Sequence, residues 1–234
     1  LVAVLDEMIG RILSRLESLG LLEDTLVVYA SDHGDHVGER GLWWKHSFYD
    51  ESVKVPMILA HRSLSRGIRD EVVSLIDLAA TMTEAMGAKA LPDSKGRSFW
   101  PLLTKGHQEW ENSVFSEYCT DAVPDWTGGR AVQQRMLREG QWKLHYYHGE
   151  TPHLYNLLDD PKELNNLAGL PAHAVQRDAM LERLLDGWNP EAVRITMERR
   201  RKNKDILASW ASNIRPASTY LWPLEPSMNR LDID

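Results

Sequence analysis

The stretch that decides the fold runs from Thr25 to Asp35 and reads Thr25-Leu26-Val27-Val28-Tyr29-Ala30-Ser31-Asp32-His33-Gly34-Asp35. Its first part, up to Ala30, is an almost uninterrupted apolar run, which is typical of a strand buried on both faces of a parallel sheet. The polar residues and the glycine that follow predict the end of the strand and a loop. In open α/β sheets, ligand sites lie where the strands end at their carboxyl ends. The stretch therefore predicts an α/β fold with a functional loop after Ala30.

The flanking segments fit the same fold class. Apolar residues recur every three or four positions from Leu1 to Leu19 and predict an amphipathic helix, which Gly20 ends. Residues 55–60 predict a second strand and residues 71–76 a third extended segment. Asp77 is expected to cap a helix that reaches Met86. Helix, short turn, apolar strand and loop form the repeating unit of a doubly wound α/β domain.

The sequence changes in character after Lys105. Four short strands are expected at residues 113–118, 133–137, 142–147 and 154–157, followed by a helix that begins near Pro171, and then by a helix rich in Arg and Lys that begins at Pro190. We therefore predict three parts. They are the C-terminal part of a doubly wound α/β domain (residues 1–106), a small antiparallel α+β subdomain (107–188) and a helical or extended tail (189–234).

Composition narrows the functional classes. The chain has 234 residues and a net charge of −7, which argues against a nucleic-acid binder because such proteins carry a basic face. The sequence contains no run of about 18 apolar residues, so no membrane-spanning helix is expected. Cys119 is the single cysteine, so no intrachain disulfide can form, which favours the cytoplasm over the periplasm. The chain begins at Leu1, inside a helical pattern, and we expect it to be a piece of a longer protein.

The loop after Ala30 carries side chains that can bind a cation and an anion. Asp32 offers a carboxylate oxygen and His33 an imidazole nitrogen, and both are ligands of divalent metals. Lys45 offers a positive charge to an oxyanion. The same residues are also compatible with a hydrogen-bonded loop and a solvated lysine. The residues alone leave both interpretations open.

A longer set of motifs resembles a known family. The motifs, in chain order, are Ser31-Asp32-His33-Gly34-Asp35, Gly38-Glu39, Gly41-Leu42-Trp43, Lys45, Phe48-Tyr49, Glu51-Ser52, Val55-Pro56, Leu75-Ile76-Asp77-Leu78, Gly96-Arg97-Ser98, Phe115-Ser116-Glu117-Tyr118, Arg135-Met136-Leu137-Arg138, Trp142-Lys143-Leu144, Leu154-Tyr155-Asn156-Leu157, Asp160-Pro161 and Glu163-Leu164-Asn165-Asn166-Leu167-Ala168. In this order they are similar to the C-terminal part of the sulfatase family, in the alkaline-phosphatase-like superfamily. The resemblance covers roughly residues 1 to 187.

The resemblance implies roles for individual residues. Asp32 and His33 match the ligands of one divalent cation, with Ca²⁺ expected first and Mn²⁺ or Mg²⁺ as alternatives. Lys45 matches the lysine that binds the sulfate oxygens, and His46 and Trp43 are further candidates at the substrate. Trp43 and its neighbour Trp44 are expected to pack in the core and line the loop, and an aromatic wall for a sugar, aryl group or quaternary ammonium is the alternative. We expect the Asp35 side chain to stabilise the loop as a hydrogen-bond acceptor.

The resemblance also shows what the chain lacks. Sulfatases use a formylglycine nucleophile made from Cys or Ser in a Cys/Ser-x-Pro/Ala-x-Arg motif, and an Asp pair near the N-terminus completes the metal site. Cys119-Thr120-Asp121-Ala122-Val123 does not match that motif. We therefore expect the formylglycine in a preceding segment, and we expect the chain by itself to be inactive.

The resemblance leaves the substrate and the assembly open. A small-molecule or saccharide sulfate ester is the expected substrate, with no nucleic acid or membrane as partner. A phosphonate or phosphate-ester hydrolase of the same superfamily is the alternative, because the same side chains suit a phosphoryl group. The segment from Trp188 to Pro223 is loosely similar to the tail of choline-sulfatase-like enzymes, which implies a homo-oligomer formed through that tail. A non-catalytic interaction domain is expected if the native chain starts at Leu1.

Overall fold

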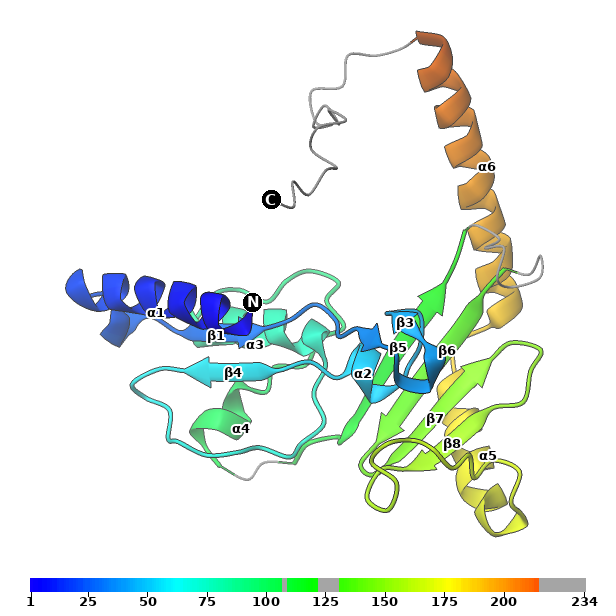
Figure 1. The fold of residues 1–234 in the computed structure, drawn as a ribbon, viewed down its shortest axis with the longest axis horizontal. Coiled ribbons are helices and arrows are strands. Elements are labelled where there is room, and N and C mark those ends of the chain that lie inside the picture. The colour runs from blue at the N-terminus through cyan, green and yellow to red at the C-terminus, as the bar shows by residue number, and fades with distance from the viewer. Residues whose placement is uncertain (107–108, 122–130, 215–234) are drawn as a thin grey trace, which may run out of the picture. The chain divides into compact units, whose positions relative to one another are not determined.

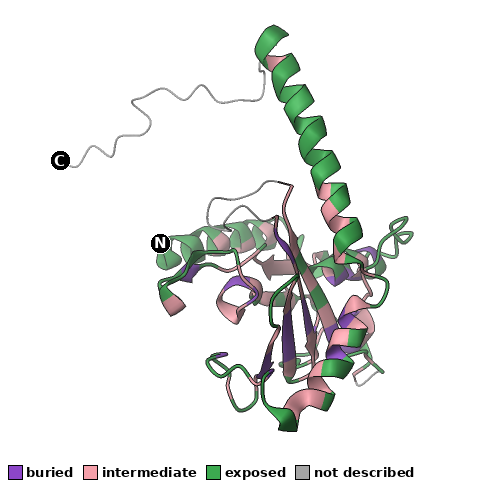
Figure 2. Cartoon of the chain, turned by 90° about the vertical axis from the view of Figure 1, so that its right-hand side faces the viewer, coloured by how far each residue is buried: buried purple, intermediate pink, exposed green. Residues whose placement is uncertain are grey.

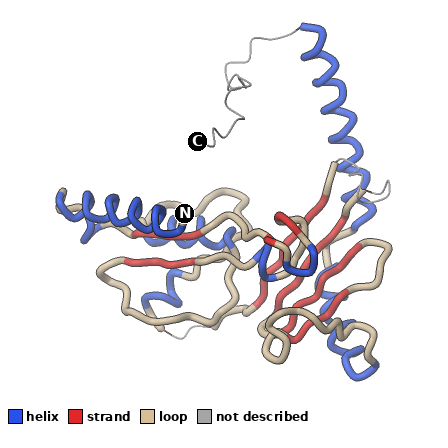
Figure 3. The backbone as a smooth tube through the Cα atoms, viewed as in Figure 1, coloured by secondary structure: helices blue, strands red, loops and turns tan. Residues whose placement is uncertain are grey.

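A computed structural model describes residues 1–106, 109–121 and 131–214 of the chain. The chain divides into two compact units, one of residues 1–118 and 132–190 and the other of residues 119–131 and 191–234. Helices and strands follow one another along the first unit, and the described part of the second is mainly one helix (Figure 3). The expected boundaries after residues 106 and 188 stay predictions.

The first part of the larger unit mixes helices with short strands (Figure 1). Its elements are α1 (Val2–Ser18), η1 (Leu22–Asp24), β1 (Val27–Ala30), β2 (His36–Val37), η2 (Glu39–Gly41), β3 (Trp43–Trp44), α2 (Asp50–Val53), β4 (Met57–Ala60), α3 (Leu75–Ala85) and α4 (Trp100–Thr104). β1 pairs with β4, and β2 pairs with β3 in a small hairpin. The functional loop predicted from the sequence thus lies between β1 and β4.

A four-stranded sheet and one helix complete this unit. The elements are β5 (Ser113–Cys119), β6 (Gln133–Glu139), β7 (Trp142–Tyr147), β8 (His153–Asn156), η4 (Pro171–His173) and α5 (Ala174–Leu185). The strand order is β5-β6-β7-β8, and the pairs β6–β7 and β7–β8 are antiparallel. The predicted small antiparallel α+β unit is confirmed, with strand bounds close to those expected.

The main hydrophobic core lies between this sheet and α5. Leu137, Leu144 and Leu154 of three neighbouring strands are fully buried and pack with Met180 and Leu184 of α5. Figure 2 shows buried residues gathered along these strands and on the adjoining helix. Burying a leucine side chain stabilises a fold by roughly 1.5–3 kcal/mol. This core therefore holds the sheet and α5 together.

The pairing of β1 differs from the prediction. β1 and β4 run antiparallel, with Val27 opposite Ala60 and Ala30 opposite Met57. The residues of β1 are only partly buried, because within the described residues this sheet has two strands. An apolar run predicts a buried strand, but it does not fix the direction of the neighbouring strand. The prediction of a parallel, doubly covered strand was wrong in this respect.

The start of α3 also differs. The third extended segment expected over residues 71–76 forms no strand, and the helix already begins at Leu75. Ser74 is the N-cap, and the Asp77 carboxylate accepts a hydrogen bond from the Ser74 N–H at 2.9 Å. Asp77 is therefore the third helical residue of a capping box and not the cap itself. The predicted end is confirmed, since Gly87 has a φ of +63°.

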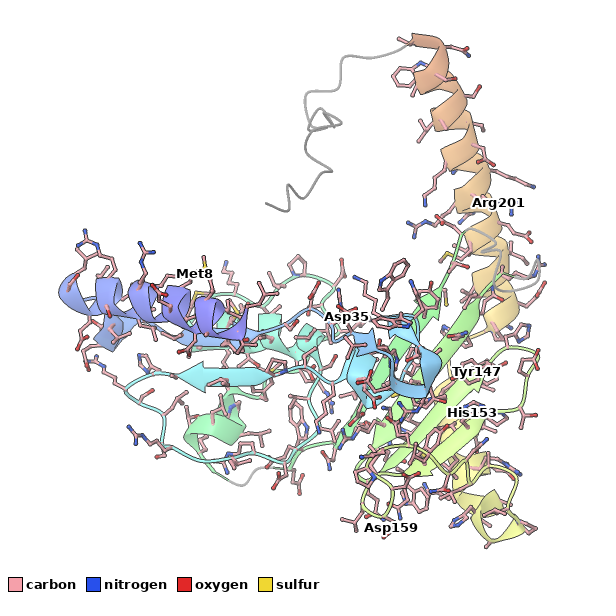
Figure 4. The ribbon with its side chains drawn as sticks, viewed as in Figure 1. Met8, Asp35, Tyr147, His153, Asp159 and Arg201 are labelled. Carbon is pink, nitrogen blue, oxygen red and sulfur yellow. The ribbon has the colours of Figure 1, made fainter. Side chains whose placement is uncertain are left out.

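In the smaller unit the described residues are dominated by α6 (Pro190–Ile214), which has no buried residue. Arg201 stands on this helix (Figure 4), and its basic neighbours are exposed, as expected of a solvated face. Asp121 lies 2.5 Å from the Lys204 ammonium. The segment after residue 214, with Trp222 and Pro223, lies outside the described residues. No helix in residues 1–106, 109–121 and 131–214 combines the length and apolar composition needed to cross a membrane.

Candidate functional site

The turn that follows β1 is held by hydrogen bonds within itself. The Ser31 hydroxyl donates to the His33 carbonyl oxygen at 2.8 Å, and the His33 N–H donates to Asp32 Oδ1 at 3.0 Å. Because a carbonyl oxygen only accepts, the His33 Nδ1 that lies 2.9 Å from the Gly34 carbonyl oxygen must carry the proton. A ring that carries only this proton has its lone pair on Nε2. This tautomer is the one that a metal-binding histidine needs.

His33 and Lys45 are 12 positions apart in the sequence and meet in the structure. The Lys45 Nζ lies 2.5 Å from His33 Nε2, which in turn lies 3.3 Å from Asp32 Oδ2. Two atoms with lone pairs, Nε2 and Oδ2, thus face one another beside an ammonium group. Such an arrangement is stabilised by positive charge, whether from the ammonium or from a bound cation. The structure brings together the three residues that the sequence predicts for one site.

The carboxylate of Asp32 is exposed and is favoured in its charged form. Its slight desolvation would raise the pKa, but the hydrogen bond from the His33 N–H and the nearby Lys45 ammonium outweigh this and hold the pKa below its ordinary value. A carboxylate that stays ionised and faces solvent is suited to bind a cation. The side chain of Asp32 is 82% exposed, so an ion could reach it without rearrangement.

The residues present fit a metal only in part. Asp32 and His33 supply one oxygen and one nitrogen donor, whereas Ca²⁺ takes six to eight ligands and Zn²⁺ four. Among residues 1–106, 109–121 and 131–214, no group of three His, Cys, Asp or Glu side chains is placed to hold a metal ion. Asp32 and His33 therefore suit part of a ligand set, and further donors would have to come from elsewhere.

The β2–β3 hairpin delivers Lys45 to the site. His36 pairs with Trp44 and Val37 with Trp43, and Gly38 adopts a φ of +118° at the turn. The Glu39 carboxylate accepts a hydrogen bond from the Val37 N–H at 2.8 Å, and this bond holds the pKa of Glu39 below its ordinary value. The short hairpin thus projects the residue after it toward the turn of Asp32 and His33.

Asp35 does not have the role that the sequence suggested. It is exposed beside the hairpin (Figure 4), and its side chain accepts no hydrogen bond from any residue that the structure describes. The prediction that it stabilises the loop as an acceptor is wrong. Glu39 has this role instead, because its longer side chain reaches the backbone N–H two residues before it.

His46 and the two tryptophans lie at the rim. Trp43 and Trp44 are 65% and 69% exposed. Neither packs in the core, so the interpretation of these residues as core residues is wrong. The His46 ring lies 6.2 Å from the Trp44 ring, and the Tyr118 hydroxyl lies 3.2 Å from His46 Nδ1. Trp44 has a φ of +67°, which is rare for a bulky residue. The direct contact of Trp43 or His46 with a substrate stays a prediction.

A hollow of about 420 Å³ opens next to these residues. Asp32, His33 and Lys45 form one part of its wall, and Tyr118 and Arg138 from the four-stranded sheet form another. Its volume lies in the range of small-molecule sites, roughly 300–1,000 Å³. The predicted site therefore borders a cavity large enough for a small anionic group and part of what it is attached to.

Sequence reasoning missed the residues that hold the loop from behind. His36 is buried, and its Nε2 lies 2.7 Å from the Ser47 hydroxyl, which ties β2 to the segment after Lys45. The Gly34 N–H donates to the Ser52 carbonyl oxygen of α2 at 2.8 Å. A Cβ at Gly34 would lie 2.1 Å from the Glu51 carbonyl oxygen, so this position requires glycine. A glycine directly after Asp32 and His33 was the only signal of this close approach in the sequence.

Comparison with known proteins identifies the family. A family model described as the C-terminal region of N-sulphoglucosamine sulphohydrolase matches residues 38–188. Choline-sulfatase of Rhizobium meliloti is 29% identical over 231 residues, which are 96% of this chain and 43% of that protein. N-acetylglucosamine-6-O-sulfatase of Bacteroides thetaiotaomicron is 27% identical over 191 residues, 78% of this chain and 33% of that protein.

Solved structures agree with this result. The phosphonate monoester hydrolase of Silicibacter pomeroyi superposes with a TM-score of 0.69 and 28% sequence identity, over 78% of this chain and 38% of that one. The chain thus spans less than half the length of the relatives that it matches. The expected fold class, the C-terminal part of an alkaline-phosphatase-like α/β fold with a small antiparallel subdomain, is confirmed. The family model covers more than half of the sequence, and the chain belongs to the sulfatase family.

Proposed function

We propose that the chain is part of a sulfatase that hydrolyses a sulfate ester, and that Asp32, His33 and Lys45 form one side of its active site. The contact of Lys45 Nζ with His33 Nε2 at 2.5 Å, on the wall of the 420 Å³ hollow, carries this proposal. It places a cationic donor next to a carboxylate and a neutral imidazole. This combination suits a metal ion and an oxyanion side by side.

Each side chain would have a distinct task. The Lys45 ammonium would donate hydrogen bonds to the sulfate oxygens and stabilise the negative charge that grows on them in the transition state. Asp32 and His33 would hold a divalent cation, with Ca²⁺ expected first, through Oδ2 and the Nε2 lone pair. Such a cation, when bound, polarises the oxygens of the ester as a Lewis acid. The nucleophile, expected to be a formylglycine, would come from another segment of the full-length protein.

The relatives and the rim support a substrate class for this proposal. Choline-sulfatase and N-acetylglucosamine-6-O-sulfatase indicate a small-molecule or saccharide sulfate ester. The exposed Trp44 ring beside His46 would suit the apolar face of a sugar or an aryl group. The 28% identity with a phosphonate monoester hydrolase supports phosphonate or phosphate esters as the second candidate.

The experiment is a rate comparison on the full-length protein. We expect kcat/KM for 4-nitrophenyl sulfate to exceed that for a 4-nitrophenyl phosphonate or phosphate ester. We also expect chelation with EDTA to abolish turnover, with Ca²⁺, Mn²⁺ and Mg²⁺ tested separately for recovery. A higher kcat/KM for the phosphonate would favour the second candidate. No turnover of any of these esters would contradict the proposal.

A further inference from the structure

A cluster of buried charges lies beside the site: Asp50 and Lys143 also line the 420 Å³ hollow, although the proposed function assigns them no task. The Lys143 side chain of β7 is fully buried, and its Nζ lies 2.6 Å from Asp50 Oδ1 and 2.9 Å from Glu163 Oε1. The Glu163 side chain is also fully buried. A lysine is almost never buried unless its charge is paired, because the loss of hydration is costly. The pairing of Lys143 with two carboxylates is therefore a specific feature of this fold.

Aromatic rings pack around His145, which lies next to this cluster. The His145 ring lies 5.3 Å from the ring of Tyr49 and 5.3 Å from that of Tyr155. Figure 4 labels Tyr147 and His153 on neighbouring strands, and the centroids of their rings lie 5.1 Å apart. Burial lowers the pKa of His145 to about 4, so its ring is neutral at pH 7. The charges in the cluster are thus those of Lys143 and the two carboxylates.

Glu163 holds α2 by two separate contacts. Its Oε2 accepts a hydrogen bond from the Asp50 N–H at 2.7 Å, while its Oε1 faces the Lys143 ammonium that also binds the Asp50 side chain. Both the backbone and the side chain of the first residue of α2 are therefore fixed. Glu163 has a φ of +52°, a conformation that is uncommon outside glycine and that the surrounding contacts must maintain.

The contacts continue from α2 to the site. The Ser52 carbonyl oxygen accepts the Gly34 N–H at 2.8 Å, and the Gly34 carbonyl oxygen accepts the proton on His33 Nδ1 at 2.9 Å. The space between Gly34 and Glu51 is too small even for a Cβ. A shift of α2 would therefore move the turn that carries Asp32 and His33, and would move His33 relative to Lys45.

We propose that Lys143 and Glu163 are positioning residues, which set the geometry of Asp32, His33 and Lys45 by fixing the start of α2. This inference rests on the proposed function for its effect on catalysis, but the positioning itself does not. A buried ion pair is weak evidence for stability, since apolar residues of similar volume often stabilise a fold equally well. Because Glu163 binds the backbone N–H of Asp50, this cluster can orient α2.

Hydrogen exchange tests the positioning without any need for turnover. In the full-length protein carrying Glu163→Gln, we expect peptides that contain Gly34 to exchange at least about 10-fold faster, while peptides from β6 change by less than about 2-fold. Glu182→Gln, the same substitution on the exposed side of α5, is the matched control. It should leave the exchange rates of the Gly34 and β6 peptides unchanged. Equal acceleration in the Gly34 and β6 peptides, or no change at Gly34, would overturn the proposal.

A double-mutant cycle tests the effect on the reaction. Glu163→Gln should lower kcat/KM by about 10-fold in the wild-type background but by less than about 2-fold when Lys45 is already alanine. A merely structural role would lower kcat/KM by the same factor in both backgrounds, and that result would overturn the proposal. Lys143→Met should behave like Glu163→Gln, and Lys143→Arg should restore part of the lost kcat/KM. If the full-length protein hydrolyses no ester, the proposed function fails while hydrogen exchange still decides the positioning.

Discussion

Replacing Gly34 by alanine should push α2 away from the site. The new Cβ would lie 2.1 Å from the Glu51 carbonyl oxygen, whereas real Cβ contacts stay above 3.0 Å. The backbone must therefore open by about 0.9 Å at this point, and the hydrogen bond from the Gly34 N–H to the Ser52 carbonyl oxygen is stretched. Overpacking of this kind costs about 1–3 kcal/mol in the free energy of unfolding.

The same shift should reduce activity by more than the loss of stability alone would explain. A displacement near 1 Å of groups in an active site can lower kcat/KM by about 100-fold. We expect a loss of this size for Gly34→Ala in the full-length protein, measured with 4-nitrophenyl sulfate at a temperature where the variant is folded. Urea unfolding followed by tryptophan fluorescence measures the change in stability separately.

Two glycines provide matched controls. A Cβ at Gly96 would lie 2.1 Å from the Ile76 carbonyl oxygen, so Gly96→Ala creates the same clash away from the site. It should lower stability by a similar amount and leave kcat/KM within about 2-fold, because among the described residues Gly96 and Ile76 make no contact with the turn that carries Asp32 and His33. Gly67 has no atom within 4 Å of the Cβ position, so Gly67→Ala should change neither. The reasoning would be refuted if Gly34→Ala and Gly96→Ala lowered kcat/KM equally, or if Gly34→Ala were as stable as Gly67→Ala.

Three further predictions address the anion contact, the core and the buried carboxylate. Lys45→Ala should lower kcat/KM of the full-length protein at least about 10-fold, whereas Lys89→Ala, an exposed lysine, should not change it. Leu154→Ala should reduce the free energy of unfolding in urea by about 2–5 kcal/mol, because Leu154 is fully buried, while Leu158→Ala at a 73% exposed position should stay within about 0.5 kcal/mol. Burial alone would raise the pKa of Glu163, but its contacts with buried neighbours lower it from 4.5 to about 2, so its stabilisation is present above pH 4.5 and is lost as the pH falls toward 2. Replacing Glu163 by Gln should remove the loss of stability at low pH that is due to this carboxyl group. The measurement is the free energy of unfolding as a function of pH.

Each of these predictions has an outcome that contradicts it. An unchanged kcat/KM in Lys45→Ala removes the assigned role of that lysine. Equal stability of Leu154→Ala and Leu158→Ala would mean that the sheet and α5 do not form the main core. If the free energy of unfolding of Glu163→Gln depends on pH in the same way as that of the wild-type protein, the assignment of a low pKa to the Glu163 carboxyl group is wrong.

The strands and the site residues were largely predictable because their signals are local. The apolar run of β1 and the aromatic-rich segment of β7 predict strands by themselves, and Asp32, His33 and Lys45 lie close enough in the sequence to meet through one short hairpin. The antiparallel pairing of β1 with β4 was not predictable, since the residues of one strand do not encode the direction of the next. The pairing depends on the whole loop between them.

The buried ion cluster was the largest omission, and its reason is physical. A lysine in a strand is usually exposed, so nothing in the sequence around Lys143 marks it as buried. Its partners, Asp50 and Glu163, lie 93 and 20 positions away along the chain. Such an arrangement exists only after the sheet and the loop before α2 have packed together. Local sequence patterns cannot report it.

The left-handed conformation of Trp44 has a consequence for protein engineering. A bulky residue at a φ of +67° costs about 1–3 kcal/mol, and glycine would adopt the same backbone freely. In a library randomised at this position and sorted only for thermal resistance, glycine and asparagine should outcompete tryptophan. Sorting the same library for hydrolysis should retain an aromatic residue if the exposed ring contacts the substrate. The ratio of the two enrichments would measure the trade-off between stability and activity at a single side chain.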